Sequence, residues 1–212
     1  MGHTVKSRDP VTTFGLLRHG ETEWNTLKKI QGWQDSPLTA KGKKQTGEWA
    51  EILQSYGWDR IIASDLGRVK ATVAILNRRL NLPVIFDERL REQNWGDWEG
   101  LTIPTIKEYF KEDLTRRVAM GWDFSAPGGE SRLAVKERVF AVLSAMAEEW
   151  AGRKILLVCH QGVVKTVLYF LTGRAFIPGE DPLLQHNCLH LINCSGQNFS
   201  PLQLNISRTP SR

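Results

Sequence analysis

The chain has 212 residues, of which 41% are hydrophobic and 24% charged, a composition typical of a globular protein. Its net charge of +5 suits an anionic small-molecule substrate, but it equally suits a nucleic acid or no charged partner. The lysine and arginine pairs are dispersed along the chain. No apolar run approaches the roughly 20 residues that a membrane span needs. We therefore expect neither a nucleic-acid partner nor a membrane partner.

Cysteine usage and the two chain ends bear on localisation. The three cysteines, Cys159, Cys188 and Cys194, are odd in number and two stand in apolar runs, which indicates reduced, buried thiols in a cytoplasmic protein. The first ten residues lack the apolar segment of a signal peptide. We predict a flexible lead-in at 1–10, a single domain over 11–207 and a flexible tail at 208–212. A monomer and a homodimer are both compatible with the sequence.

Apolar runs and helical patterns alternate along the chain. Strands are predicted at 13–19, 60–64, 83–86, 154–158, 187–193 and 201–206, and helices at 39–55, 65–80, 102–112 and 162–172. A further long helix is indicated by an apolar stripe from Val135 to Trp150. This alternation predicts an α/β fold, a three-layer α/β/α sandwich around a mostly parallel sheet. Residues 87–130, irregular apart from the helix at 102–112, are predicted to form an insert that covers the active site.

Three predicted strands end in charged or polar residues. The first ends at Arg18 and His19, the second is followed by Arg68, and a later one ends at His160. Ligands of open α/β sheets lie beyond the carboxyl ends of the strands, so these side chains should converge. Phosphoryl transfer needs a nucleophile that is neutral near pH 7 and fixed cations around the phosphoryl oxygens. Each of these residues taken alone is more often a cap or surface residue than a catalytic one, and only the set predicts a phosphoryl-transfer site.

Several sequence blocks occur in a recognisable order. They are LRHGETEWN at 17–25, QGWQDSPLTAKGKKQ at 31–45, SDLGR at 64–68, LREQNWGDWEG at 90–100, PGGES at 127–131 and VCH at 158–160. Together these blocks resemble the histidine phosphatase (phosphoglycerate mutase-like) superfamily, in particular its cofactor-independent phosphatase branch. The resemblance extends from about residue 12 to residue 195. A histidine phosphatase fold with a phosphorylated histidine is what this resemblance implies.

The resemblance also assigns roles to individual residues. It makes His19 the nucleophile, with one ring nitrogen attacking phosphorus and the other donating to a backbone carbonyl. Arg18 and Arg68 would clamp the phosphoryl oxygens, a protonated His160 would donate to the same oxygens, and Glu92 would transfer protons to and from the oxygen that leaves or attacks. Further phosphate or substrate contacts are implied for Asn25, Gln31, Gly32 and Gln161, the last standing where many members have glycine. Neither a metal ion nor a cofactor is expected.

Three functions fit this set of residues. The segment between Glu99 and Glu130 is short and, apart from Arg116 and Arg117, lacks the basic stretch that binds the substrate carboxylate in longer mutases of this family. This favours a phosphatase that hydrolyses a small phosphorylated metabolite. Phosphoglycerate mutase-type phosphoryl transfer is the first alternative. A module that binds phosphorylated ligands without catalysis is the second, and the presence of every catalytic residue type speaks against it.

Overall fold

The computed structural model describes residues 10–208. One six-stranded sheet has the order β3-β2-β4-β1-β5-β6. Its strands are β1 Val11–Arg18, β2 Arg60–Ala63, β3 Val84–Phe86, β4 Lys154–Cys159, β5 Leu189–Ser195 and β6 Asn198–Ile206. Strands β3, β2, β4 and β1 run parallel, whereas β5 and β6 are antiparallel to their neighbours. The mostly parallel sheet predicted from the sequence is confirmed.

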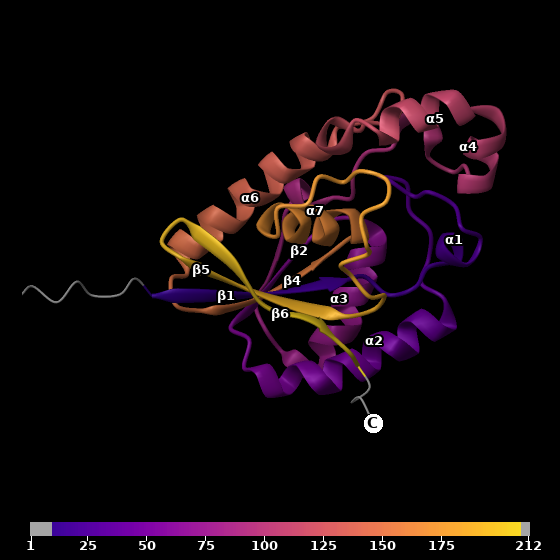
Figure 1. Ribbon diagram of the computed structural model, residues 1–212. Helices are drawn as coiled ribbons and strands as arrows, with labels where there is room; N and C mark the ends of the chain where they lie inside the picture. Colours follow the sequence, from indigo (N-terminus) through magenta and orange to yellow (C-terminus); the bar gives the residue numbers. More distant parts are fainter. Residues whose placement is uncertain (1–9, 209–212) are drawn as a thin grey trace, which may run out of the picture.

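Helices cover both faces of this sheet. The α-helices within residues 10–208 are α1 Glu23–Thr26, α2 Ala40–Leu53, α3 Gly67–Leu80, α4 Ile103–Tyr109, α5 Lys111–Val118, α6 Arg132–Glu149 and α7 Gln161–Leu171. Helices α2 and α3 lie on one side of the sheet, and α6 and α7 on the other (Figure 1). The sequence pattern explains the two cores, because successive strand side chains point to opposite faces. Leu156 packs in the α2/α3 core, and its neighbour Leu157 packs in the α6/α7 core.

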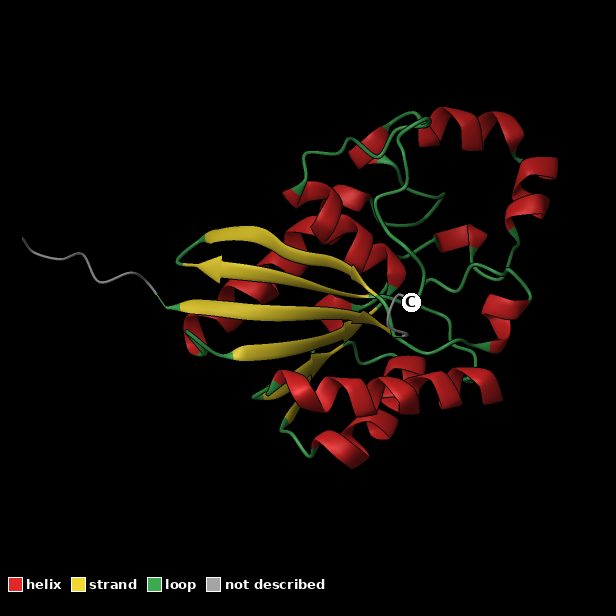
Figure 2. Ribbon diagram, turned by 60° about the horizontal axis from the view of Figure 1, so that its bottom comes forward, coloured by secondary structure: helices red, strands yellow, loops and turns green. Residues whose placement is uncertain are grey.

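The insert differs from its prediction. The single helix expected at 102–112 is broken into α4 and α5 at Phe110, whose backbone angles (φ −131°, ψ 29°) are not helical. This break brings the Phe110 ring to a centroid distance of 6.4 Å from Trp98. Trp98, Ile106 and Phe124 are fully buried and form a small core separate from the two beside the sheet. Helices α4 and α5 lie beyond the carboxyl ends of the parallel strands (Figures 1 and 2).

The predicted strand boundaries shift most at the end of the chain. Strand β5 lies two residues later than predicted, and β6 begins three residues earlier, so that the two join in a tight hairpin at Gly196, whose φ is +59°. The predicted flexible ends fall outside the described residues, except for Pro10 and Arg208. Arg208 is anchored, because its Nε lies 2.7 Å from the Glu48 carboxylate on α2. No helix among residues 10–208 has the length and apolar character to cross a membrane.

Candidate active site

The sheet brings the predicted catalytic side chains to one edge. Arg18 ends β1 and pairs in register with Cys159 of β4, which places His19 and His160 side by side. Their ring centroids are 5.3 Å apart. Arg68 lies in the first turn of α3, just after β2. Since β1, β2 and β4 are parallel, all of these residues follow the carboxyl ends of neighbouring strands.

A cavity of about 190 Å³ opens at this edge. It is lined by Arg18, His19, Asn25, Lys29, Ile30, Gln31, Gly32, Arg68, Glu92, Trp95 and Ile103. Every predicted site residue is on this wall except His160 and Gln161. His160 is fully buried beside His19, and Gln161 is the first residue of α7. The wall residues Lys29, Ile30 and Ile103 were not predicted, because their place depends on how the insert folds back.

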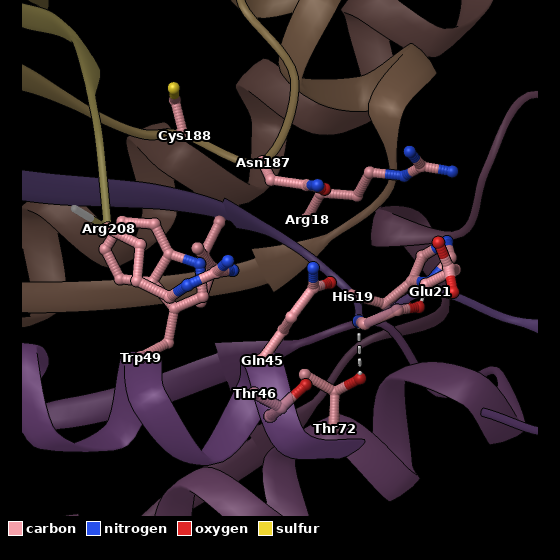
Figure 3. A pocket seen from close by; sticks show the side chains of 12 residues that line it. Arg18, His19, Glu21, Gln45, Thr46, Trp49, Thr72, Asn187, Cys188 and Arg208 are labelled. Atoms are coloured by element: carbon pink, nitrogen blue, oxygen red, sulfur yellow. Dashed lines mark hydrogen bonds between the residues drawn. The ribbon is translucent and has the colours of Figure 1, made fainter. Parts of the chain in front are cut away.

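A second and much smaller cavity lies behind the nucleophile (Figure 3). Its volume of about 20 Å³ has room for about one water molecule and none for a phosphomonoester. Here the Gly20 N–H donates to Thr72 Oγ1 over 3.0 Å. A side chain at Gly20 would begin 2.7 Å from Thr46 Oγ1 of α2. The chain at Gly20 is therefore packed against α2 and α3 on this side, and substrate must enter by the larger cavity.

His19 has the tautomer that a nucleophile needs. Its Nδ1 lies 2.8 Å from the carbonyl oxygen of Gly20 and donates to it, which leaves the lone pair on Nε2. Burial and the nearby Arg18 and Arg68 guanidinium groups lower the pKa of His19 well below 6.5. The ring is therefore neutral at pH 7. A neutral imidazole held by a backbone carbonyl is the arrangement that the sequence resemblance implies.

Arg68 is held by a loop and keeps one edge free. Its Nη1 donates to Gln34 O over 2.6 Å and to the Asp35 carboxylate over 2.8 Å, and its Nη2 donates to Gly32 O over 2.7 Å. Its Nε is buried and has no partner in the part of the chain that the structure describes. The Nε–H and the second Nη2–H therefore remain for a ligand. This guanidinium edge matches two oxygens of a phosphoryl group.

Other buried polar atoms around the cavity also lack partners within residues 10–208. Arg18 Nε, Gln31 Oε1 and His160 Nδ1 are in this state. Burying a polar group without a hydrogen bond costs about 1–3 kcal/mol, so a group of such atoms indicates a place for a ligand. Asn25 adds a donor of its own. Its Oδ1 accepts from the Thr22 N–H over 3.1 Å in a helix cap, which leaves the amide NH₂ for a ligand.

The charge of His160 in the free site differs from the protonated state predicted for the phosphate-bound site. Burial, then Arg68, His19 and Arg18, lower the pKa of His160 well below 6.5, so the ring is neutral in the free site rather than protonated. Its Nε2 lies 2.8 Å from Ser64 Oγ. If the Ser64 hydroxyl donates to Nε2, the ring proton stands on Nδ1. A neutral His160 can then still donate to a phosphoryl oxygen, and a bound dianion would raise its pKa.

Glu92 supplies the carboxylate of the cavity wall. Its Oε1 accepts from the Gln93 N–H over 2.9 Å, and its Oε2 accepts from the Gly162 N–H at the start of α7 over 3.1 Å. Only glycine allows this approach, because a Cβ at residue 162 would lie 2.2 Å from Glu92 Oε1. Each oxygen keeps capacity for a further hydrogen bond. Within residues 10–208, no three or more His, Cys, Asp or Glu side chains form a metal-binding group.

Comparison with known proteins gives a consistent family. Residues 14–207 match the family described as "Histidine phosphatase superfamily (branch 1)". A Salmonella newport protein named "Probable phosphoglycerate mutase GpmB" is 38% identical over 85% of this chain and 80% of its own length. The structure of Bacillus stearothermophilus YhfR has a TM-score of 0.85 and 29% identity, covering 92% of this chain and 98% of its own.

Several of the similar structures have phosphatase names. A mycobacterial glucosyl-3-phosphoglycerate phosphatase in complex with VO3 is 28% identical, with a TM-score of 0.79, over 95% of this chain and 100% of its own. The α-ribazole phosphatase from Shigella flexneri is 25% identical, with a TM-score of 0.78, over 94% of this chain and 98% of its own. The relatives and similar structures thus agree on the family. Their names differ in the reaction, because some are called mutases and others phosphatases.

Proposed function

Because the chain belongs to the histidine phosphatase superfamily, we propose that it hydrolyses a small phosphomonoester through a phosphohistidine on His19. The observation that carries this proposal is the state of His19, which is neutral and fixed by Gly20 O so that Nε2 is the nucleophilic atom. Beside it, Arg18 and Arg68 present unpartnered donors to the same cavity. Charge neutralisation and positioning supply most of what phosphoryl transfer requires, so the proposal includes no metal ion and no cofactor.

The first step transfers the phosphoryl group to the enzyme. The lone pair of His19 Nε2 forms the N–P bond while the bond from phosphorus to the ester oxygen breaks. The leaving oxygen takes a proton from Glu92, which ends the step as a carboxylate. Arg18, Arg68 and the His160 Nδ1–H hold the phosphoryl oxygens as the charge between nucleophile and leaving group shifts.

The second step returns the enzyme to its starting state. Glu92 accepts a proton from a water molecule, whose oxygen forms a bond to phosphorus as the N–P bond breaks. Inorganic phosphate leaves, the electron pair returns to His19 Nε2, and Glu92 is again protonated. The hydrogen bond from Nδ1 to Gly20 O is present throughout, so the imidazole needs no tautomer change between turnovers.

The insert favours hydrolysis over mutase-type transfer. Arg117 donates to the Asp113 carboxylate and to Ser125 O, and Arg116 also pairs with Asp113. Neither arginine lines the cavity. The one basic pair of the insert thus makes its bonds within the insert and does not reach a substrate carboxylate. Phosphoglycerate mutase-type transfer is the second candidate, and the name of the curated relatives favours it.

The test measures release of phosphate from p-nitrophenyl phosphate by wild type and by His19→Ala, with EDTA present. We expect activity in the wild type only, and acid-labile labelled phosphate on the protein after denaturation of a turnover mixture. An inactive wild type, or an equally active variant, would contradict the proposal. A screen of phosphorylated metabolites, scored for free phosphate and for isomerised product, separates the two candidates. Dominant isomerisation of phosphoglycerate would favour the mutase.

A further inference from the structure

Glu92 lies in a segment that the sheet does not hold. Residues 91–95 form neither helix nor strand, and they connect two short 3₁₀ turns, Glu88–Leu90 and Gly96–Trp98. The position of the Glu92 main chain depends instead on its carbonyl oxygen. That oxygen accepts from Trp33 Nε1 over 2.8 Å and from Arg138 Nη2 over 3.0 Å. Two side chains from distant parts of the sequence thus hold the residue that is proposed to move protons.

Arg138, a residue of α6, holds the segment at 91–95 through its guanidinium. Its guanidinium forms a two-bond ion pair with Glu130, at 2.6 and 3.1 Å, and also donates to Arg89 O over 2.6 Å. Glu130 in turn accepts from the Asn94 N–H over 2.9 Å. The Arg138 and Glu130 side chains are only 17% and 19% exposed, so the pair is shielded from water. The segment is therefore fixed on both sides of Glu92.

Trp33 holds the segment at 91–95 from another side. It belongs to the loop at 32–34, which also binds the Arg68 guanidinium. The main-chain N–H of Trp33 donates to Glu99 Oε1 over 2.8 Å. The carbonyls on either side of it, Gly32 O and Gln34 O, accept from the Arg68 guanidinium. Trp33 is 41% exposed, so it contributes little to the core. Its indole N–H still makes a directed bond to Glu92, which a tryptophan kept only for surface packing does not need.

We propose that Trp33 and Arg138 are positioning residues for Glu92, which hold its main chain so that the carboxylate reaches the ester oxygen of a substrate. The inference rests on the proposed function, because it assigns a purpose to that placement. The loop at 32–34 joins the two ends of the site. It orients Arg68 toward the phosphoryl group through two carbonyls and fixes Glu92 through the Trp33 indole. Both contact the wall residue Glu92, but neither Trp33 nor Arg138 lines the cavity itself.

The test compares two substrates whose leaving groups differ in whether they must be protonated as they leave. p-Nitrophenolate leaves without protonation, whereas the alkoxide of glycerol 3-phosphate does not. The variant Trp33→Phe keeps an aromatic ring and removes only the indole N–H. We expect kcat/KM to fall about 10-fold for glycerol 3-phosphate and less than about 2-fold for p-nitrophenyl phosphate. The matched control is Trp122→Phe, which removes an indole bond to Arg174 O and should change neither value.

Two further measurements distinguish positioning from general support. In a Glu92→Gln background, Trp33→Phe should cause no further loss for glycerol 3-phosphate, because the bond acts through Glu92. Lysine at residue 138 cannot keep the bonds of the guanidinium to Glu130, Arg89 O and Glu92 O. Arg138→Lys should therefore also lower kcat/KM more for glycerol 3-phosphate than for p-nitrophenyl phosphate, whatever its effect on Tm. Equal losses for both substrates, or additive losses in the double variant, overturn the inference alone. A wild type inactive toward both substrates overturns the proposed function, and the inference falls with it.

Discussion

The two ends of the cavity are built in different ways. The phosphoryl end, with Arg18, His19 and His160, follows the carboxyl ends of adjacent parallel strands and is held by the ladder hydrogen bonds of the sheet. The proton-transfer end is a segment without regular structure, held by side-chain bonds to the main chain of Glu92. A sheet edge fixes the part of the site that every phosphomonoester shares. An insert held by a few side chains can change with the leaving group while the sheet stays the same.

After loss of the nucleophile itself, the largest loss of activity is expected at the phosphoryl end, from Arg68→Lys. A lysine cannot hold Gly32 O, Gln34 O and Asp35 and still present two donors to a phosphoryl group. Two charge-assisted hydrogen bonds contribute about 3–6 kcal/mol, so kcat/KM should fall by about 10² to 10⁴-fold for alkyl and aryl phosphates alike. The measurement is steady-state kinetics on both substrate types. A loss confined to alkyl phosphates would place Arg68 with the acid end instead.

A pH dependence of stability should follow from the histidines at the sheet. Burial lowers the pKa of His19 and His160 well below 6.5 and that of His190 to about 4. Between the folded and unfolded pKa values, only the unfolded chain binds the protons, so stability falls as pH drops below about 6.5. The slope is about 1.4 kcal/mol per pH unit for each histidine, and stability is level above pH 7 as far as these groups are concerned.

Urea unfolding between pH 5 and pH 8 measures this slope. Vanadate or phosphate should reduce it, because an anion beside His19 and His160 favours their protonated forms in the folded state. A free energy of unfolding that is constant from pH 5 to pH 7 would contradict the neutral state assigned to these rings. A slope that the anion leaves unchanged would assign the pH dependence to His190, whose Nδ1 accepts from the Asn205 N–H of β6, rather than to the adjacent rings of His19 and His160.

Substitutions at two glycines test which end of the cavity is more rigid. A Cβ at Gly42 would lie 2.2 Å from the main-chain oxygen of Glu21, whereas a Cβ at Gly162 would lie 2.2 Å from the side-chain Oε1 of Glu92. We expect Gly42→Ala to lower Tm and to reduce activity on both substrate types, because backbone must move. Gly162→Ala should leave Tm unchanged or raise it, since alanine favours helix, and should reduce kcat/KM about 10-fold for glycerol 3-phosphate only. Thermal unfolding with kinetics tests both, and a lower Tm for Gly162→Ala would contradict this contrast.

The smallest effect is expected at the outer wall of the cavity, where Lys29 lies. Its ammonium is 5.4 Å from the centre of the Trp24 ring, and it has no carboxylate partner among the described residues. Lys29→Gln should lower kcat/KM for 3-phosphoglycerate about 5-fold relative to glycerol 3-phosphate. Only 3-phosphoglycerate has a carboxylate, and a partly exposed ion pair between that carboxylate and the Lys29 ammonium contributes about 1 kcal/mol. Lys28→Gln removes the same charge from an exposed neighbouring side chain and is the control. Equal ratios in both variants would show a general field effect rather than a contact.

The sequence alone determined the phosphoryl end. Buried strands are recognisable as short apolar runs, and parallel strands bring their carboxyl ends to one edge, so the sequence is enough to group Arg18, His19, Arg68 and His160. The blocks from Leu17 to His160 then supplied Glu92, Asn25, Gln31 and Gly32, all of which line the cavity. Gln161 was expected at the phosphate but is not on the wall. Its neighbour Gly162, which receives Glu92, was not singled out.

The tertiary structure alone decided how the acid end is held. Trp33 and Arg138 contact the carbonyl of Glu92 across 59 and 46 residues of sequence, and such long-range side-chain bonds leave no periodic signal in the chain. The same holds for the break at Phe110, whose ring centroid lies 6.4 Å from that of Trp98. Local patterns encode strands, helices and the sheet edge because their hydrogen bonds are regular. The placement of an irregular insert depends on individual contacts, which exist only once the chain has folded.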